Sequence, residues 1–224
     1  MNKLFFAAIF GALLLNFACA PFKIYQKPIV FDEQRMQLTK EYMMERYGFD
    51  STTTGTINPK MVVLHWTAIP TLKKSYAAFE KSTLPNWRPE ITSAGSLNVS
   101  AHFLVDKNGK VYQLMPDTLM ARHVIGLNHC AIGVENVGGV DGKPLSARQK
   151  RANVKLIEHL KEKYPIEYVI GHYEYTHFES HPLWLEKDSA YRTSKTDPGE
   201  KFMKKVRKQL KDYDFKTVPQ KNEK

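Results

Sequence analysis

Two histidines and one aspartate are the residues whose types best suit a catalytic metal site. His65 lies near the end of the apolar run M-V-V-L-H-W-T, and His172 ends the run I-E-Y-V-I-G-H. Asp197 lies in the turn T-S-K-T-D-P-G. Two imidazoles and one carboxylate, with a fourth position left for water, are a typical ligand set of catalytic zinc. Asp197 could instead simply cap a helix, and either histidine could be a polar loop residue.

Two further charged residues could take part in chemistry at such a site. Lys195 lies two residues before Asp197, where its cation could stabilise an anion or simply face water. Glu135 lies within the apolar run A-I-G-V-E-N-V-G-G. A carboxylate inside a buried strand is costly unless it is paired, hydrogen-bonded or functional, so Glu135 calls for an explanation.

Short apolar runs alternate with helical patterns along the chain and predict the elements that position these residues. The Asn-Gly turn between A-H-F-L-V-D and V-Y-Q-L-M-P is a strong hairpin signal. Buried strands are expected near residues 61–67, 131–137 and 166–172. Helices are expected near residues 32–48, 71–82, 146–163 and 200–210, the last with Asp197 at its cap, while residues 21–30 suit an extended arm.

This alternation predicts an α/β fold, in which a single domain has a central mixed β-sheet flanked by helices. Ligands of such folds bind in the crevice beyond the carboxyl ends of the strands. His65 and His172 both end strands, so we expect a zinc site in a cleft at the sheet edge. The chain has 224 residues and is 42% hydrophobic, which is enough to build one such core.

The first residues have the pattern of an export signal. A short basic start precedes an apolar run over residues 4–15 and then small residues, and this run is too short for a transmembrane helix. Pro21 disfavours cleavage after Ala20, so we expect lipoprotein processing with residues 1–18 as the signal peptide and Cys19 as the first mature residue. The expected location is a membrane, with the lipid-anchored protein facing the periplasm or the cell surface.

The charge of the chain indicates its partners. The formal net charge is +10, and such a field favours anionic partners. Outside the cytoplasm these are wall polymers or membrane surfaces rather than nucleic acid. Cys130 is the only cysteine besides Cys19, so a lipid on Cys19 excludes an intramolecular disulfide. We expect a monomer that touches the membrane only through its anchor.

Five segments between residues 62 and 202 are specific in combination and order. They are L-H-W-T-A, S-A-H-F-L-V-D-K-N-G-K-V-Y-Q-L, R-H-V-I-G-L-N-H-C-A-I-G-V-E-N-V-G, G-H-Y and K-T-D-P-G. In this combination the chain resembles the zinc-dependent N-acetylmuramoyl-L-alanine amidases of the type 2 amidase and peptidoglycan-recognition-protein superfamily. The resemblance implies hydrolysis of the amide bond between N-acetylmuramic acid and L-alanine in peptidoglycan or muropeptides.

The resemblance also implies a role for each matching residue. His65, His172 and Asp197 would hold one Zn²⁺ per chain. Glu135 would be the acid/base residue and Lys195 the stabiliser of the oxyanion, roles that suit a carboxylate and a cation beside a zinc-activated water. Two residues stand where relatives contact the muropeptide and are expected to bind substrate: His123 and Asn128.

The implied domain division follows these segments. Residues 19–58 would be an N-terminal arm and helix, residues 59–212 the amidase catalytic domain, and residues 213–224 a charged tail.

Two features depart from the family pattern. Ala101 stands where some members carry a tyrosine, which favours the variant that works through the glutamate. His172 and Asp197 are 25 residues apart (197 − 172), more than is usual in the family. The intervening segment contains His177 and His181, either of which could replace His172 as a ligand.

Alternative interpretations stay open at this stage. A non-catalytic peptidoglycan-binding receptor on the same fold would typically lack a zinc ligand, whereas this chain has a full set. A zinc peptidase of the commonest class would carry H-E-x-x-H, which is absent. Side chains with two possible roles are Arg122 and Arg192, which could bind stem-peptide carboxylates or face solvent, and Trp66, Trp87 and Trp184, which could stack on sugars or fill the core. His102 and His159 are expected to be structural.

Overall fold

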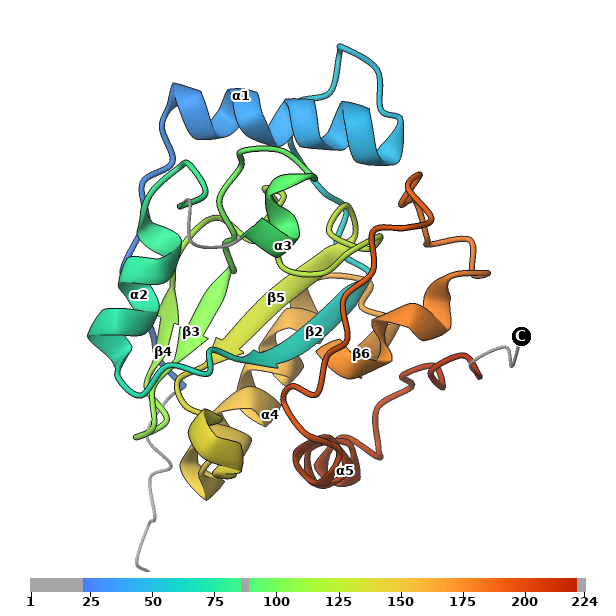
Figure 1. The fold of residues 1–224 in the computed structure, drawn as a ribbon. Helices are drawn as coiled ribbons and strands as arrows, with labels where there is room; N and C mark the ends of the chain where they lie inside the picture. Colours follow the sequence, from blue (N-terminus) through green and yellow to red (C-terminus); the bar gives the residue numbers. More distant parts are fainter. Residues whose placement is uncertain (1–21, 86–88, 221–224) are drawn as a thin grey trace, which may run out of the picture.

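A six-stranded mixed sheet forms the centre of the protein in a computed structural model that describes residues 22–85 and 89–220 (Figure 1). The strand order is β1-β4-β3-β5-β2-β6, and only β3 and β4 pair antiparallel. The strands are β1 (Ile24–Gln26), β2 (Met61–Trp66), β3 (Phe103–Val105), β4 (Val111–Gln113), β5 (Ala131–Asn136) and β6 (Tyr168–Gly171). The expected α/β domain with a mixed sheet is confirmed.

The antiparallel pair is the hairpin that the Asn-Gly dipeptide predicts. Gly109 has φ of 85°, a left-handed conformation that a side chain would make costly. Its amide donates to the carbonyl of Asp106, which closes the turn. The other strands pair in parallel and are connected across the sheet.

Five α-helices surround the sheet within the described residues. They are α1 (Glu33–Tyr42), which continues as a π-helical turn (Met43–Tyr47), α2 (Leu72–Glu80), α3 (Pro89–Thr92), α4 (Ala147–Lys163) and α5 (Glu200–Gln209). Asp32, Thr71 and Ser146 cap α1, α2 and α4, each by accepting the backbone N–H of the residue three positions later. None of the helices in this part of the chain is long and apolar enough to span a bilayer.

The expectation that Asp197 caps the last helix is wrong. Gly199 occupies the N-cap position of α5, with no side-chain cap. The Asp197 carboxylate turns instead toward His65 and His172. Asp197 lies two residues before this N-cap, and its Oδ2 atom contacts two buried imidazole nitrogens.

The two faces of the sheet have different cores. Along β2, Val62 and Leu64 belong to the cluster that includes apolar residues of α4 and α5. Met61 and Val63 belong to the cluster on the opposite face, beneath the end of α1 and the long loops. Side chains alternate between faces along a strand, so His65 lies on the second face, away from α4 and α5.

Part of the expected extended arm forms an edge strand of the sheet. Ile24–Gln26 pair with β4 as the edge strand β1, and the Phe22 ring lies 6.1 Å from that of His159 on α4. Arg35 on α1 donates to the carbonyls at the end of α2, those of Phe79 and Lys81 among them. These contacts join the first described residues to the sheet, to α4 and to the end of α2.

Candidate functional site

Three ligand-type atoms converge at the ends of β2 and β6. The Nδ1 atoms of His65 and His172 are 3.0 Å apart, and Asp197 Oδ2 lies 3.2 Å and 3.1 Å from them. With zinc–ligand bonds of about 2.0 Å, two ligands of a tetrahedral site are about 3.3 Å apart. The triangle therefore matches one face of a tetrahedral site to within a few tenths of an ångström. Of the described residues, these three form the group that could hold a metal ion.

Backbone pairing explains why the three side chains meet. Leu64 and Gly171 are partners in the parallel pair of β2 and β6, and His65 and His172 directly follow them. The loop that carries Asp197 is held beside β6, because the Tyr173 amide donates to the Asp197 carbonyl. Two strand ends and one backbone hydrogen bond thus fix the triangle.

The electrostatics of the triangle suit a cation. Burial lowers the pKa of His172 to about 4, which keeps its imidazole neutral at pH 7. Burial alone would raise the pKa of the Asp197 carboxyl, but His172 and His65 outweigh it and hold that pKa well below its usual range. Metal ligands must be a neutral imidazole and an ionised carboxylate, so the residues present fit a zinc ion.

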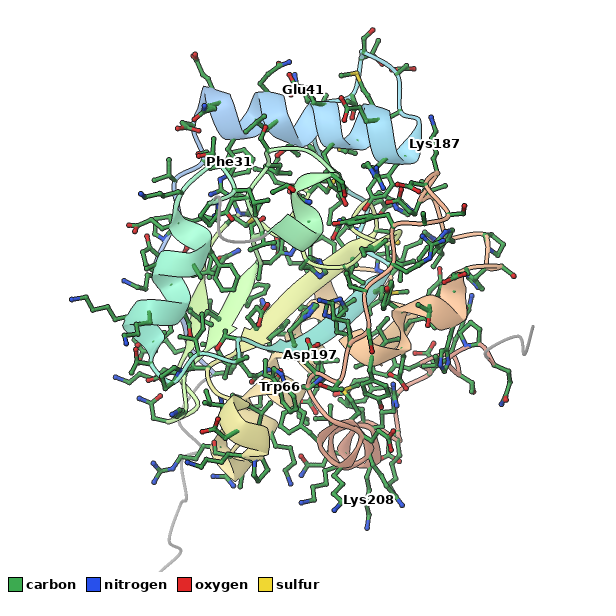
Figure 2. All side chains as sticks on the ribbon, in the orientation of Figure 1. Phe31, Glu41, Trp66, Lys187, Asp197 and Lys208 are labelled. Carbon is green, nitrogen blue, oxygen red and sulfur yellow. The ribbon has the colours of Figure 1, made fainter. Side chains whose placement is uncertain are left out.

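A cleft of about 370 Å³ opens at this triangle. Its polar lining includes the three triangle residues together with Glu135 and Lys195. Trp66 lines it as well and is labelled beside Asp197 in Figure 2. Its apolar wall comes from helices α2 and α3 and from the loops: Phe79, Ile91, Ile69, Val99 and Ile125.

The two residues expected to act in the chemical step are 60 positions apart in the sequence (195 − 135) but line the same cleft. Glu135 on β5 is the register partner of His65. Lys195 precedes Asp197 on the loop and is half-buried. It makes no hydrogen bond or ion pair with the described part of the chain, so its cation is available to a ligand.

The two expected substrate contacts have extensive bonds within the protein. Asn128 Oδ1 accepts the amides of His123 and Val124, and its Nδ2 donates to the Tyr47 hydroxyl. The His123 ring lies between the His65 ring and strand β5, and burial, followed by the nearby His65, lowers its pKa well below the ordinary value. Both residues line the cleft, and their contact with substrate stays a prediction.

The two other histidines of the 173–196 segment face away from the triangle. His177 Nδ1 lies 3.0 Å from the carbonyl oxygen of Pro219, and His181 Nε2 lies 3.1 Å from the Tyr168 hydroxyl. The geometry therefore favours His172 as the ligand.

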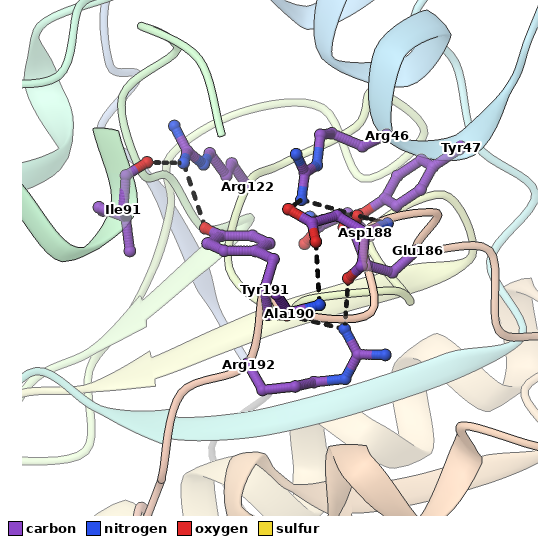
Figure 3. A network of polar contacts seen from close by, with 10 residues as sticks. Arg46, Tyr47, Ile91, Arg122, Glu186, Asp188, Ala190, Tyr191 and Arg192 are labelled. Carbon is purple, nitrogen blue, oxygen red and sulfur yellow. Dashed lines mark hydrogen bonds and ion pairs between the residues drawn. The ribbon is translucent and has the colours of Figure 1, made fainter. Parts of the chain in front are cut away.

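The same segment forms a polar network with α1 (Figure 3). Arg46, in the turn that ends α1, contacts the buried Glu186 at 2.8 Å and the exposed Asp188 at 3.3 Å. Arg192 pairs with Glu179 at 2.9 Å. The long spacing between His172 and Asp197 thus builds a loop that packs on the N-terminal helix.

Arg122 is buried rather than exposed, a position that the sequence pattern did not predict. Its guanidinium donates to the Ile91 carbonyl and the Tyr191 hydroxyl (Figure 3). It also donates to the carbonyls of Gly95 and Leu97. It joins the loop around α3 to the 173–196 segment. Its guanidinium N–H groups donate to these protein oxygens, so Arg122 has a structural role.

Other residues that the sequence singled out are His102, two tryptophans and Cys130. His102 is buried and contacts the Leu119 carbonyl and the Gly133 amide, as a structural residue would. Trp184 stacks on Tyr175, and Trp87 lies outside the described residues. Cys130 is buried directly before β5, and burial raises the pKa of its thiol to about 12, which disfavours a ligand role.

Comparisons with known proteins identify the family of the chain. A sequence profile described as N-acetylmuramoyl-L-alanine amidase matches residues 55–200, a range that contains every residue of the site. None of the curated proteins compared with the chain matches it.

Several solved structures are similar to the chain. The N-acetylmuramoyl-L-alanine amidase LysC from Clostridium intestinale URNW is 18% identical, with a TM-score of 0.48, over 84% of this chain and 97% of that one. A selenomethionine derivative of AmpD is 22% identical, with a TM-score of 0.46, over 72% and 96%. Human PGRP-IBETAC, in complex with glycosamyl muramyl pentapeptide, is 17% identical, with a TM-score of 0.48, over 76% and 94%.

Proposed function

The chain belongs to the N-acetylmuramoyl-L-alanine amidase family, in the type 2 amidase and peptidoglycan-recognition-protein superfamily, and on this premise we propose that it is a zinc-dependent amidase. Its reaction is hydrolysis of the amide bond between N-acetylmuramic acid and L-alanine in peptidoglycan or muropeptides. The observation that carries the proposal is the triangle of His65, His172 and Asp197, with Glu135 and Lys195 facing the same cleft.

In this reaction the residues of the site have three roles: metal binding, proton transfer and charge stabilisation. His65, His172 and Asp197 hold the ion, which when bound supplies Lewis acidity toward the amide carbonyl and lowers the pKa of a water molecule. Glu135 accepts the proton of the attacking water and returns it to the departing L-alanine amine. Lys195 places its ammonium where negative charge develops on the carbonyl oxygen. The products are a lactyl carboxylate on the sugar and a free amino group on L-alanine.

The walls of the cleft contribute binding and exclusion of water. Apolar side chains such as Phe79 and Val99 line one side, and burial of substrate against them strengthens the electrostatic interactions at the triangle. Arg122 holds the loops on this side in place through the carbonyls that it binds. The cleft is thereby preorganised for a ligand larger than a single amide.

The second possible function is that of a peptidoglycan-binding receptor without catalysis. Both functions predict binding of muropeptide, and only the enzyme needs Glu135 and Lys195 beside a complete ligand set. The presence of all five residues at one cleft favours the enzyme.

The test uses the purified full-length protein loaded with zinc and a defined muropeptide. Mass spectrometry should detect the lactyl sugar and the peptide with a free amino-terminal L-alanine, and chelation should stop their release. The matched control is the His65→Ala variant. Muropeptide binding without release of products by the zinc-loaded protein would establish the receptor instead.

We further propose that the protein is exported and lipid-anchored at Cys19, with residues 19–58, 59–212 and 213–224 as arm, catalytic domain and tail. The leader pattern supports this location, although the leader and Cys19 lie outside the described residues. A monomer held at the membrane by this anchor would face the wall. Fractionation of cells that express the native protein or the Cys19→Ser variant tests the anchor, and unchanged membrane association of the variant would exclude acylation there.

A further inference from the structure

His123 connects the metal triangle to the backbone of strand β5. Its Nδ1 lies 3.0 Å from His65 Nε2, and its Nε2 lies 3.2 Å from the carbonyl oxygen of Ala131. His65 uses its other nitrogen, Nδ1, in the triangle with His172 and Asp197. His65 therefore contacts the other two triangle residues through one ring nitrogen and His123 through the other, and His123 in turn contacts the Ala131 carbonyl.

Hydrogen-bond chemistry determines where the protons lie along these contacts. A carbonyl oxygen only accepts, so His123 Nε2 must carry the proton and donate it to Ala131. In a neutral ring Nδ1 is then a bare acceptor, and the partner that faces it, His65 Nε2, must donate. His65 is thereby left with an unprotonated Nδ1 directed at the metal triangle.

We propose that His123 is a positioning residue that holds His65 in the tautomer whose Nδ1 is free to bind zinc. The proposal rests on the proposed zinc site, and it gives His123 a role that does not depend on contact with substrate. A hydrogen-bonded partner behind a metal-ligating histidine fixes both its ring orientation and its tautomer.

The residues around His123 fix the position of its ring. A Cβ atom at Gly133 would lie 2.7 Å from ring carbons of His123, so only glycine at this position of β5 leaves room. The ring is nearly perpendicular to that of His65, at 89° and 5.1 Å between centroids. Asn128 holds the backbone below it by accepting the His123 amide at 2.9 Å.

The test compares two substitutions of similar size in the full-length protein. In His123→Asn, the amide oxygen stands close to the former Nδ1 and can accept from His65. In His123→Leu, no acceptor is present. Zinc affinity is measured by competition with a chromophoric chelator, and Co²⁺ spectra report the ligand geometry. We expect the leucine variant to bind zinc about 10- to 100-fold more weakly and the asparagine variant to stay within a few-fold of wild type.

Controls separate this role from simple packing and from the proposed function. His181→Leu makes the same change at a histidine that contacts Tyr168 instead of His65, and it should leave zinc affinity unchanged. Equal affinities of the leucine variant and wild type, or equal losses in the leucine and asparagine variants, would overturn the role of His123 alone. Absence of zinc binding by wild type would instead overturn the metal site itself.

Tautomers can also be read directly in the wild-type protein, in case the leucine variant does not fold. Long-range ¹⁵N–¹H correlation spectra distinguish protonated from bare ring nitrogens. The proposal expects a proton on Nε2 of His123 and none on its Nδ1. A proton on His123 Nδ1 would contradict it.

Discussion

His65 and Glu135 are register partners on the neighbouring parallel strands β2 and β5. Partners in register project on the same face of a sheet, so the pairing of two backbones sets a metal-ligand candidate and a carboxylate side by side. Strand pairing is rigid, and no loop needs to close to bring the two residues together. This relationship is the basis for separating the residues that hold the metal from those that act on the substrate.

Replacement of Glu135 by glutamine should preserve the fold and zinc binding while turnover falls by about 10²- to 10⁴-fold, the usual contribution of general acid/base catalysis. The amide has nearly the same shape as the carboxylate but cannot accept the proton of water. Release of amino-terminal L-alanine, zinc content and melting temperature are measured together, with Glu162→Gln on the surface of α4 as the control. Activity of Glu135→Gln within a few-fold of wild type would assign the proton transfer to another residue.

Replacement of Lys195 by alanine should lower turnover by roughly 10²- to 10³-fold, the loss typical of removing one oxyanion donor. Its half-buried ammonium lines the cleft and has no hydrogen bond to the described residues, so little structure depends on it. The exposed Lys204 on α5 supplies the matched control, Lys204→Ala. An equal change in both variants would point to a general charge effect.

Alanine at His65, His172 or Asp197 should abolish activity and weaken zinc binding, because each substitution removes one corner of the triangle. His177→Ala and His181→Ala should keep the metal, since their rings contact Pro219 and Tyr168 instead. Elemental analysis after dialysis measures the zinc. Full zinc in His172→Ala together with zinc loss in His177→Ala or His181→Ala would move the second ligand into the inserted segment.

Removal of Arg46 should destabilise the protein by about 3–5 kcal/mol, because the fully buried Glu186 carboxylate would lose its cation. Asp188, whose side chain is 46% exposed, contacts the same guanidinium in solvent, and Asp188→Asn should cost at most about 1 kcal/mol. Urea unfolding of Arg46→Met and Asp188→Asn gives both values. Similar losses of unfolding free energy in the two variants would show that the buried Arg46–Glu186 pair matters no more to stability than the exposed Asp188 contact.

Stability should fall as the pH decreases from about 6.5 to about 4, in part through His129. Burial lowers the pKa of His129 from 6.5 to about 4, and its Nδ1 has no hydrogen-bond partner in the described structure. The folded pKa lies below the unfolded one, so the unfolded chain binds the proton first. Its stabilising contribution is complete above pH 6.5 and decreases by about 1.4 kcal/mol per pH unit down to the folded pKa.

The contribution of His129 is isolated by comparing wild type with His129→Phe, which keeps a ring against Tyr47 and Phe49. Urea unfolding is followed from pH 7 to pH 4 with a chelator present, so that loss of metal does not enter the comparison. The phenylalanine variant should show a shallower pH dependence, and substitution of the exposed His159 is the control. Parallel curves for wild type and His129→Phe would contradict the prediction.

Much of the fold follows from local patterns in the sequence. The apolar runs ending in His65 and His172 predicted β2 and β6, the Asn-Gly dipeptide predicted the hairpin, and Ser146 marked the start of α4. These signals are readable because strand burial, turn conformation and capping depend on residues close in sequence. The order of the five motifs also placed the chain in the correct family.

Only the tertiary structure decided where loop side chains turn. The local sequence around Asp197 suited either a helix cap or a metal ligand, and its carboxylate contacts two histidines from distant strands. Arg122 reads as a surface residue, yet carbonyls from the α3 loop surround it. His123 gains its position from Gly133 and Ala131 on a neighbouring strand. In each case the partners come from other segments of the chain, and a local pattern contains no information about which of them the fold will bring within hydrogen-bond distance.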